Sequence, residues 1–204
     1  MVTCMTSPLL NRVYDLWGRR ELHDFIRQGI LLAQNSLRRH YSTGESLVDI
    51  IFHTVTTGQF YRITGVEVDA VKRGFLALVR RLNKEMDMGL RDDAQIFTST
   101  EYAGDKCSLY GAEEPFLRIS RRPVSKYRRF CVTKNGFFGL VPRGTNEGDR
   151  VTILYGGVVP FIIRPQLRDS KTVDTLVGHG YFHGLMHGEA LDLPSFAPGE
   201  IVLV

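Results

Sequence analysis

The pattern of apolar and polar positions divides this chain into a helical first part and a β-rich last part. Apolar residues recur at helical spacing over 21–37, 47–55 and 68–86, which predicts three helices. The third has the clearest apolar stripe, with its lysines and arginines off that stripe. We expect the stripe to pack on the two preceding helices rather than to bind a partner or an anionic membrane. Residues 1–18 show no such pattern, and we expect a loosely held lead-in.

Capping residues mark where the second and third helices begin. Ser46 with Asp49, and Thr64 with Glu67, have the spacing at which a hydroxyl and a carboxylate each satisfy a backbone N–H at a helix start. Gly58 is expected to end the second helix.

The β-rich part begins with two predicted hairpins. Asn135 and Gly136 separate the apolar runs 130–133 and 137–141, and this residue pair favours the two positive φ angles of a type I′ turn. A second hairpin should pair 151–155 with 158–164. Its turns come from four residues, namely Gly148 and Asp149 before the first strand and Gly156 and Gly157 between the two.

The remaining runs complete a predicted sheet. Pro160 lacks an N–H and therefore belongs at an edge or a bulge. The run 175–185 is rich in glycine, and 201–204 should form a last strand beside an early one, closing the sheet. Several short strands at this spacing are typical of a small barrel.

The sequence therefore predicts an α+β protein, with an N-terminal helical region followed by a small antiparallel β-barrel. We expect a helical region over 1–90, a connector over 91–126 and the barrel domain over 127–204. The connector is expected to contain at most a short helix near 97–102 or 116–120.

Composition narrows the classes of function. The 43% of apolar residues suffice for a buried core, and the three cysteines are odd in number and lack C-x-x-C spacing, so neither a disulfide framework nor a zinc site is indicated. No apolar run is long enough to span a bilayer. We expect a soluble, cytoplasmic protein without membrane contact. The net charge is +4, and we interpret the basic cluster before the first hairpin as a solvated linker; it comprises Arg118, Arg121, Arg122, Lys126, Arg128 and Arg129.

Many residues of the β-rich part recur in a known family at the same spacing. They are Arg128, Arg129, Phe130, Thr133, Gly136, Gly139, Leu140, Pro142, Gly148, Asp149, Val151, Leu154, Gly156, Gly157, Pro160, Phe161, Arg164, Pro165, Leu176, Val177, Gly178, Tyr181, His183, Gly184, Met186, Gly188, Glu189 and Ala190. The stretch that contains them, about a third of the chain, resembles the C-terminal region of fungal heterokaryon-incompatibility (HET-domain) proteins. Residues 41–52 resemble the helical middle of those proteins less specifically.

The resemblance implies a function and excludes part of the family architecture. No segment before Arg128 resembles the N-terminal HET domain, so we expect a portion detached from that effector. It would be a non-catalytic regulatory or interaction region, linked to fungal nonself recognition and programmed cell death, with a protein as partner. The identity of the partner, a small-molecule ligand and the oligomeric state stay open.

Three histidines raise a metal hypothesis, which their surroundings disfavour. His179, His183 and His187 repeat every four residues, but the interspersed glycines oppose a helix. On a strand neighbouring histidines of this set would share a face but lie about 13 Å apart at roughly 3.3 Å per residue, beyond the reach of one ion. In the family the positions of His179 and His187 are more often acidic or polar. We expect the His183 ring to bond a backbone carbonyl, and Glu189 to tie the end of the barrel through Arg164.

No reaction is predicted. A His183–Glu189 acid/base pair would need a nucleophile, an oxyanion donor or a metal, and none has a motif. Gly156 and Gly157 lack the lysine of a phosphate loop. We therefore predict no catalytic, cofactor-binding or metal residues, and assign structural roles to Asn135, Gly136, Gly148, Asp149, Gly156, Gly157, Arg164, Gly178, His183, Gly184, Gly188 and Glu189.

Two rival functions remain. The first is a nucleic-acid-binding module, with the basic cluster and stacking aromatics at Tyr127, Phe130, Phe137 and Phe138. The second is an enzyme in which His183 and Glu189 converge in a barrel mouth.

Overall fold

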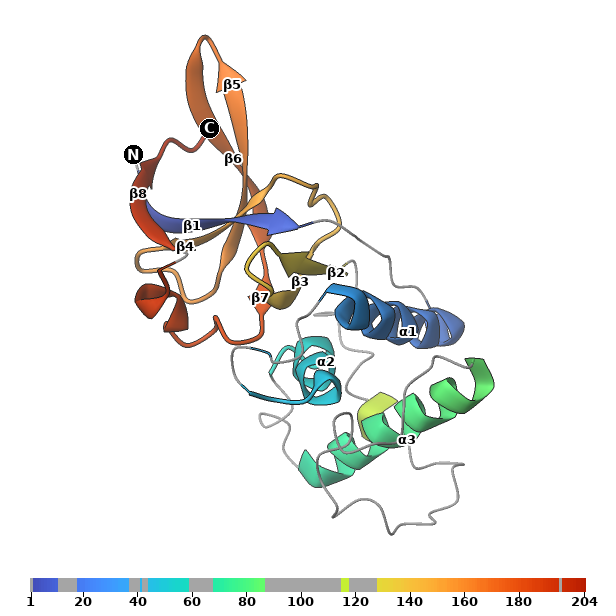
Figure 1. Ribbon diagram of the computed structural model, residues 1–204. Helices are drawn as coiled ribbons and strands as arrows, with labels where there is room; N and C mark the ends of the chain where they lie inside the picture. Colours follow the sequence, from blue (N-terminus) through green and yellow to red (C-terminus); the bar gives the residue numbers. More distant parts are fainter. Residues whose placement is uncertain are drawn as a thin grey trace. The chain divides into compact units, whose positions relative to one another are not determined.

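The computed structural model describes residues 2–10, 18–36, 41, 44–58, 68–86, 115–117, 128–194 and 196–204. They fall into two compact units, each described by itself. The helical unit contains the three long helices and the short helix at 115–117, and the β unit contains all the described strands (Figure 1). Most of the expected connector lies outside the described residues, and within it 115–117 are helical. None of the helices in the described part of the chain combines the length and apolarity needed to cross a bilayer.

The three predicted helices are confirmed. They are α1 (Gly18–Ser36), α2 (Leu47–Val55) and α3 (Val68–Met86). Aromatic rings connect α3 with α2 and with the short helix at 115–117, because the Phe75 ring lies 5.5 Å from the ring of Phe52 in α2 and 5.0 Å from that of Phe116. The buried apolar side chains of the helices are Leu22, Phe25, Ile26, Ile30, Leu32, Ala33, Val48, Ile50, Ile51, Phe52, Val55, Val71, Phe75, Leu76, Leu78, Val79 and Leu82. The stripe of α3 therefore packs inside the helical unit.

The ends of α2 largely follow the prediction. The Ser46 hydroxyl accepts a hydrogen bond from the Asp49 N–H at 3.1 Å. The Asp49 carboxylate, however, accepts from that hydroxyl at 2.7 Å and binds Lys72 of α3 at 2.7 Å, instead of the Ser46 N–H. Thr57 and Gly58 end the helix with φ angles of 51° and 62°. Thr64 and Glu67 lie outside the described residues.

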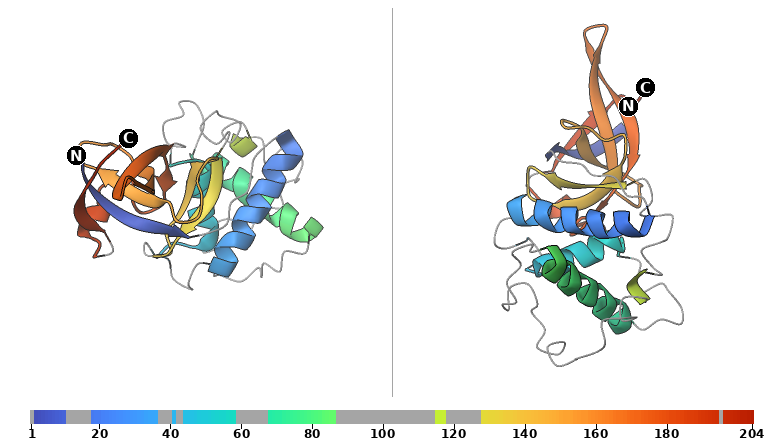
Figure 2. Two further views of the ribbon diagram at one scale, coloured as in Figure 1. Left: turned by 90° about the horizontal axis from the view of Figure 1, so that it is seen from above. Right: turned by 90° about the vertical axis from the view of Figure 1, so that its right-hand side faces the viewer.

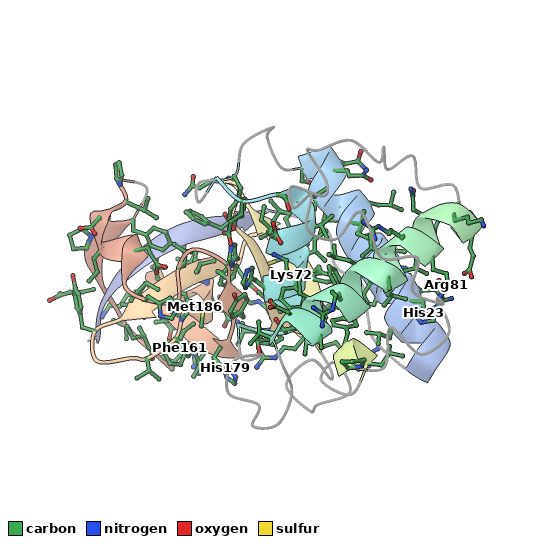
Figure 3. The ribbon with its side chains drawn as sticks, turned by 90° about the horizontal axis from the view of Figure 1, so that it is seen from below. His23, Lys72, Arg81, Phe161, His179 and Met186 are labelled. Carbon is green, nitrogen blue, oxygen red and sulfur yellow. The ribbon has the colours of Figure 1, made fainter. Side chains whose placement is uncertain are left out.

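The polar surface of the helical unit contains a second link between helices. Arg81 of α3 lies 3.3 Å from both Glu85, one turn later, and the ring of His23 in α1 (Figure 3). Ion pairs this exposed contribute little stability, so the apolar interior holds the unit together.

The β unit contains one antiparallel sheet of eight strands. In the order β6-β5-β4-β1-β2-β3-β7 each strand pairs with its neighbours, and β8 also pairs with β1. The strands are β1 (Val2–Leu10), β2 (Arg128–Thr133), β3 (Phe138–Pro142), β4 (Arg150–Leu154), β5 (Phe161–Arg168), β6 (Lys171–His179), β7 (Tyr181–Phe182) and β8 (Ala197–Ile201). The α+β class is confirmed. The sheet is not a closed barrel, because the strands at the two ends of this order, β6 and β7, do not pair with each other. The two strands are consecutive in sequence, with Gly180 between them.

The expectation of a loose lead-in at the N-terminus is wrong. Residues 2–10 form β1, which pairs with β4 over Cys4–Pro8, with β8 over Val2–Thr6 and with β2 at Leu9 and Leu10. A strand bonded on both sides draws its stability from its partners, so its own residues need not show a strand pattern. The last strand does lie beside an early one, but it spans 197–201 rather than 201–204.

The first hairpin is confirmed, but its turn type is not. Strands β2 and β3 pair with Cys131 opposite Gly139. The Thr133 N–H donates to the Phe137 carbonyl at 2.9 Å, which leaves a three-residue loop in which Gly136 has a φ of 85°. Asn135 has no positive φ, so this is a turn followed by one left-handed glycine. Consecutive positive φ angles occur instead at Asp169 and Ser170, between β5 and β6.

The second hairpin is confirmed, but its second strand begins and ends later than the expected 158–164 and spans Phe161–Arg168. Val151 of β4 lies opposite Ile162 of β5, and β5 begins at Phe161, just after Pro160. The third run divides into β6 and β7. Strands β5 and β6 form a long hairpin that extends beyond the other strands of the unit (Figures 1 and 2).

Aromatic and branched side chains fill the interior of the β unit. The rings of Phe130 and Phe138 stack at 5.1 Å, and Ile163 and Ile201 pack together. Cys131 is also buried, and this burial raises the pKa of its thiol well above the ordinary value. A buried thiol that keeps its proton is a packing residue rather than a nucleophile.

Candidate interaction site

Two arginines clamp the β3–β4 loop, residues 143–149. One lies on β2, which pairs with β3, and the other on β5, which pairs with β4. Arg129 of β2 donates to the carbonyls of Arg143 at 2.9 Å and Thr145 at 3.3 Å. Arg164 of β5 donates to the carbonyl of Gly144 at 2.7 Å. Loop carbonyls that would otherwise need water are thus bonded to side chains of the sheet, which fixes the course of the loop.

A buried carboxylate at the end of the same loop completes the clamp. Asp149 is 1% exposed, and its two oxygens accept from Arg164 Nε at 2.8 Å and Nη2 at 2.9 Å. The Asn146 N–H donates to the same carboxylate at 2.8 Å. This hydrogen bonding raises the pKa of Arg164. Gly148, with a φ of 89°, turns the chain so that Asp149 faces inward.

The prediction that Glu189 binds Arg164 is wrong. Arg164 binds Asp149, whereas Glu189 accepts from the His187 N–H at 2.6 Å. Gly188, with a φ of 96°, precedes η3 (Glu189–Asp192), so Glu189 serves a local turn. Asp149 lies fifteen residues from Arg164, and the adjacency of β4 and β5 brings them together.

The clamped loop presents polar side chains outward. Arg143, Asn146 and Glu147 are exposed, whereas Thr145 is buried. A loop held by charge-assisted hydrogen bonds loses little conformational entropy when it binds a partner. The loop can therefore take part in recognition through a positive side chain, a negative side chain and an amide.

A second arginine–histidine contact lies at the end of β6. Arg128 of β2 donates to the His179 carbonyl, and its Nη2 lies 2.6 Å from the His179 ring Nε2. Burial lowers the pKa of Arg128, and burial with the nearby Arg128 charge lowers the pKa of His179. Phe161 lies opposite His179 in the sheet (Figure 3).

The three histidines of the metal hypothesis have different environments. The Nδ1 of His183 lies 3.3 Å from the Tyr181 hydroxyl, and the His183 N–H donates to the Phe138 carbonyl. His187 contacts Glu189 through its backbone, and His179 contacts Arg128. Within the described ranges, no three His, Cys, Asp or Glu side chains are placed to hold one metal ion.

The remaining predicted glycines lie in turns or at close contacts. Gly156 and Gly184 have positive φ angles. A Cβ on Gly157 would come within 2.8 Å of the Phe161 ring, and one on Gly178 within 2.8 Å of Pro142. Gly139 has the tightest contact, because a Cβ there would meet the Tyr181 carbonyl and the Phe182 ring.

Three of the four aromatic residues of the nucleic-acid alternative are described, and none of these three is exposed for stacking. Phe130, Phe137 and Phe138 are at most 5% exposed and form the interior. Of the basic cluster, Arg128 and Arg129 are described, and both donate to backbone carbonyls. Tyr127 and the other basic residues of the cluster lie outside the described part of the chain.

The sequence alone did not identify Arg129 as part of this site. It appeared only as one charge of a basic cluster, and the contact that gives it a role spans β2 and the β3–β4 loop. A signal was present, because Arg129 and Gly139 both belong to the residues that carry the family resemblance.

Comparison with known proteins finds a matching domain family and a similar curated protein. Residues 110–194 match the Het-6 beta-barrel domain. A stretch of 65 residues is 32% identical to the "Heterokaryon incompatibility protein 6, OR allele" of Neurospora crassa, and it covers 32% of this chain and 10% of that protein. The match thus spans about a tenth of the length of this curated relative. No solved structure matches the chain. The predicted resemblance is confirmed: this is a protein similar to fungal heterokaryon-incompatibility proteins, with a match to the Het-6 β-barrel domain over residues 110–194.

Proposed function

We propose that the β unit is a non-catalytic interaction region of a heterokaryon-incompatibility-type protein, acting in the cytoplasm in fungal nonself recognition and the cell death that follows it. The observation that carries the proposal is the match of residues 110–194 to the Het-6 beta-barrel domain, together with the similarity to an incompatibility protein. The partner is another protein.

The clamped β3–β4 loop supports this role. Arg129 and Arg164 hold its carbonyls, and the buried Asp149 fixes its end, so Asn146 is presented from a pre-formed scaffold. Loops on rigid sheets are the usual place for recognition residues. Three charged residues of the unit have structural contacts: Asp149 and Arg164 bind each other, and Glu189 accepts a hydrogen bond within a turn.

Expression in Neurospora crassa tests the proposal. Heterokaryons would be formed between strains with and without the chain, and their growth and viability scored. We expect the wild-type chain to reduce viability, and Asn146→Lys to weaken that effect without changing the melting temperature. Lys134→Asn is the matched control, because it exchanges the same two residue types at another exposed turn position.

Three outcomes would contradict the proposal. Unchanged viability with the wild-type chain would exclude a role in incompatibility. An equal effect of Asn146→Lys and Lys134→Asn would exclude the loop as the recognition surface. Turnover of a substrate by the purified chain would show that the region is catalytic.

A further inference from the structure

The edge of the sheet beside β6 bears a short segment of the same chain, residues 202–204. The Asp174 N–H donates to the Val202 carbonyl at 2.7 Å, and the Val204 N–H donates to the Asp174 carbonyl at 3.0 Å. Leu203 lies opposite Asp174 in parallel orientation. Figure 1 shows this end of the chain beside β6. In the described residues this ladder has only these two backbone hydrogen bonds.

The same edge extends beyond Asp174 on both sides. Pro165 of β5 lies opposite Asp174 and has no N–H, so the backbone groups of Asp174 face away from β5. Because these directions alternate along a strand, Thr172 and Leu176 face the same edge as Asp174. Both side chains are exposed. The edge can therefore pair with a strand longer than the segment that now occupies it.

Asp174 also has one carboxylate oxygen that the sheet does not satisfy. The residue is 4% exposed, and its Oδ1 is buried without a hydrogen-bond partner among the described residues. Its register partner, Leu203, is apolar and offers no donor. Buried acceptors in folded proteins are almost always bonded, so an orphaned carboxylate oxygen marks a place where a donor is missing.

We propose that the β6 edge is a docking edge for an extended strand of a protein partner, with a lysine or arginine opposite Asp174. Residues 202–204 hold the edge until that strand displaces them. The proposal rests on the proposed function and gives the β unit a second protein-binding surface besides the β3–β4 loop.

Two features select this occupant. Backbone donors and acceptors at strand spacing are matched by another strand, as in recognition by strand addition. The carboxylate selects a cation and repels the phosphates of nucleic acids and lipids. The resident segment is weakly held, because its side chains remain 43%, 36% and 60% exposed.

Peptide binding tests the docking edge. The probe is a fluorescently labelled peptide of residues 199–204 with Leu203→Lys, and the control peptide has Leu203→Glu. Each peptide is titrated by fluorescence anisotropy against two variants of the full chain. Val204→Pro removes the N–H that donates to the Asp174 carbonyl, and Val204→Ala keeps that N–H. We expect the lysine peptide to bind the proline variant about tenfold more tightly than the alanine variant. The glutamate peptide should bind neither, and adding Asp174→Asn should abolish the difference between the peptides.

A second measurement does not depend on peptide affinity. Leu203→Lys in the full chain should raise the melting temperature of the β unit, and the rise should disappear in the Asp174→Asn background. Equal binding of the two peptides, no gain with Val204→Pro, or a lower melting temperature for Leu203→Lys would each overturn the docking edge. The heterokaryon assay tests the proposed function separately. Peptide binding can be observed when the chain has no effect on heterokaryon viability, and such an effect can be observed without peptide binding.

Discussion

Replacing Asp149 by alanine should strongly destabilise the β unit. The change removes the acceptors of two hydrogen bonds from Arg164 and one from the Asn146 N–H. Breaking a buried ion pair by removing one partner costs about 3–5 kcal/mol. The Arg164 side chain is 31% exposed and can be rehydrated, so we expect the smaller loss of about 2–3 kcal/mol.

Calorimetry gives a direct measure of this loss. In a unit of this size each 1 kcal/mol shifts the melting temperature by about 4–8 °C, so Asp149→Ala should lower it by about 10–20 °C. Asp149→Asn keeps the shape and one acceptor oxygen, so its melting temperature should lie between those of the wild type and Asp149→Ala. A double variant with Arg164→Leu should lose little more than Asp149→Ala, because the two residues act as one pair. A shift below about 4 °C for Asp149→Ala would refute the clamp.

Two further predictions concern the hairpin turn and the histidine beside Arg128. Gly136→Val should lower the melting temperature because it forces a β-branched residue to a φ of 85°. Gly144→Val is the control: Gly144 has open space around it and no positive φ, so its replacement should change the melting temperature much less. Equal effects of the two substitutions would contradict the turn geometry. Because burial and Arg128 lower the pKa of His179 in the folded chain, the unfolded chain takes up the proton first as the pH falls below about 6.5. His179 therefore stabilises the fold above that pH, and the contribution is lost as the pH falls through its lowered pKa. Melting temperatures at about pH 7.5 and 5.5 should show a smaller drop for His179→Gln than for wild type, and an equal drop would contradict the assignment.

Local patterns predicted much of this fold. Helix α2 begins and ends where Ser46 and Gly58 indicated, because a cap involves only residues a few positions apart. The first two hairpins were predicted for the same reason. The turn type at Asn135 was wrong, since loop length, not the residue pair alone, selects the turn.

Most of the long-range pairing, apart from the last strand beside an early one, could not be predicted from the sequence. Neither β1 nor the contact of Arg129 with the β3–β4 loop has a local signature, because each depends on partners far away in the chain. Arg164 illustrates the same limit: its charge suggested an acidic partner, and the strand register decides that this is Asp149 rather than Glu189.

The position of β1 has a consequence for how the protein is made. Leu10 pairs with Val132, roughly 120 residues later, so β1 leaves the ribosome long before β2 and must wait for that partner. Until then its amides are unmatched, and contacts this distant along a chain form slowly. A fusion partner placed before Val2 therefore adjoins the middle of the sheet, and refolding yield should respond to such additions more strongly than to tags at the other end.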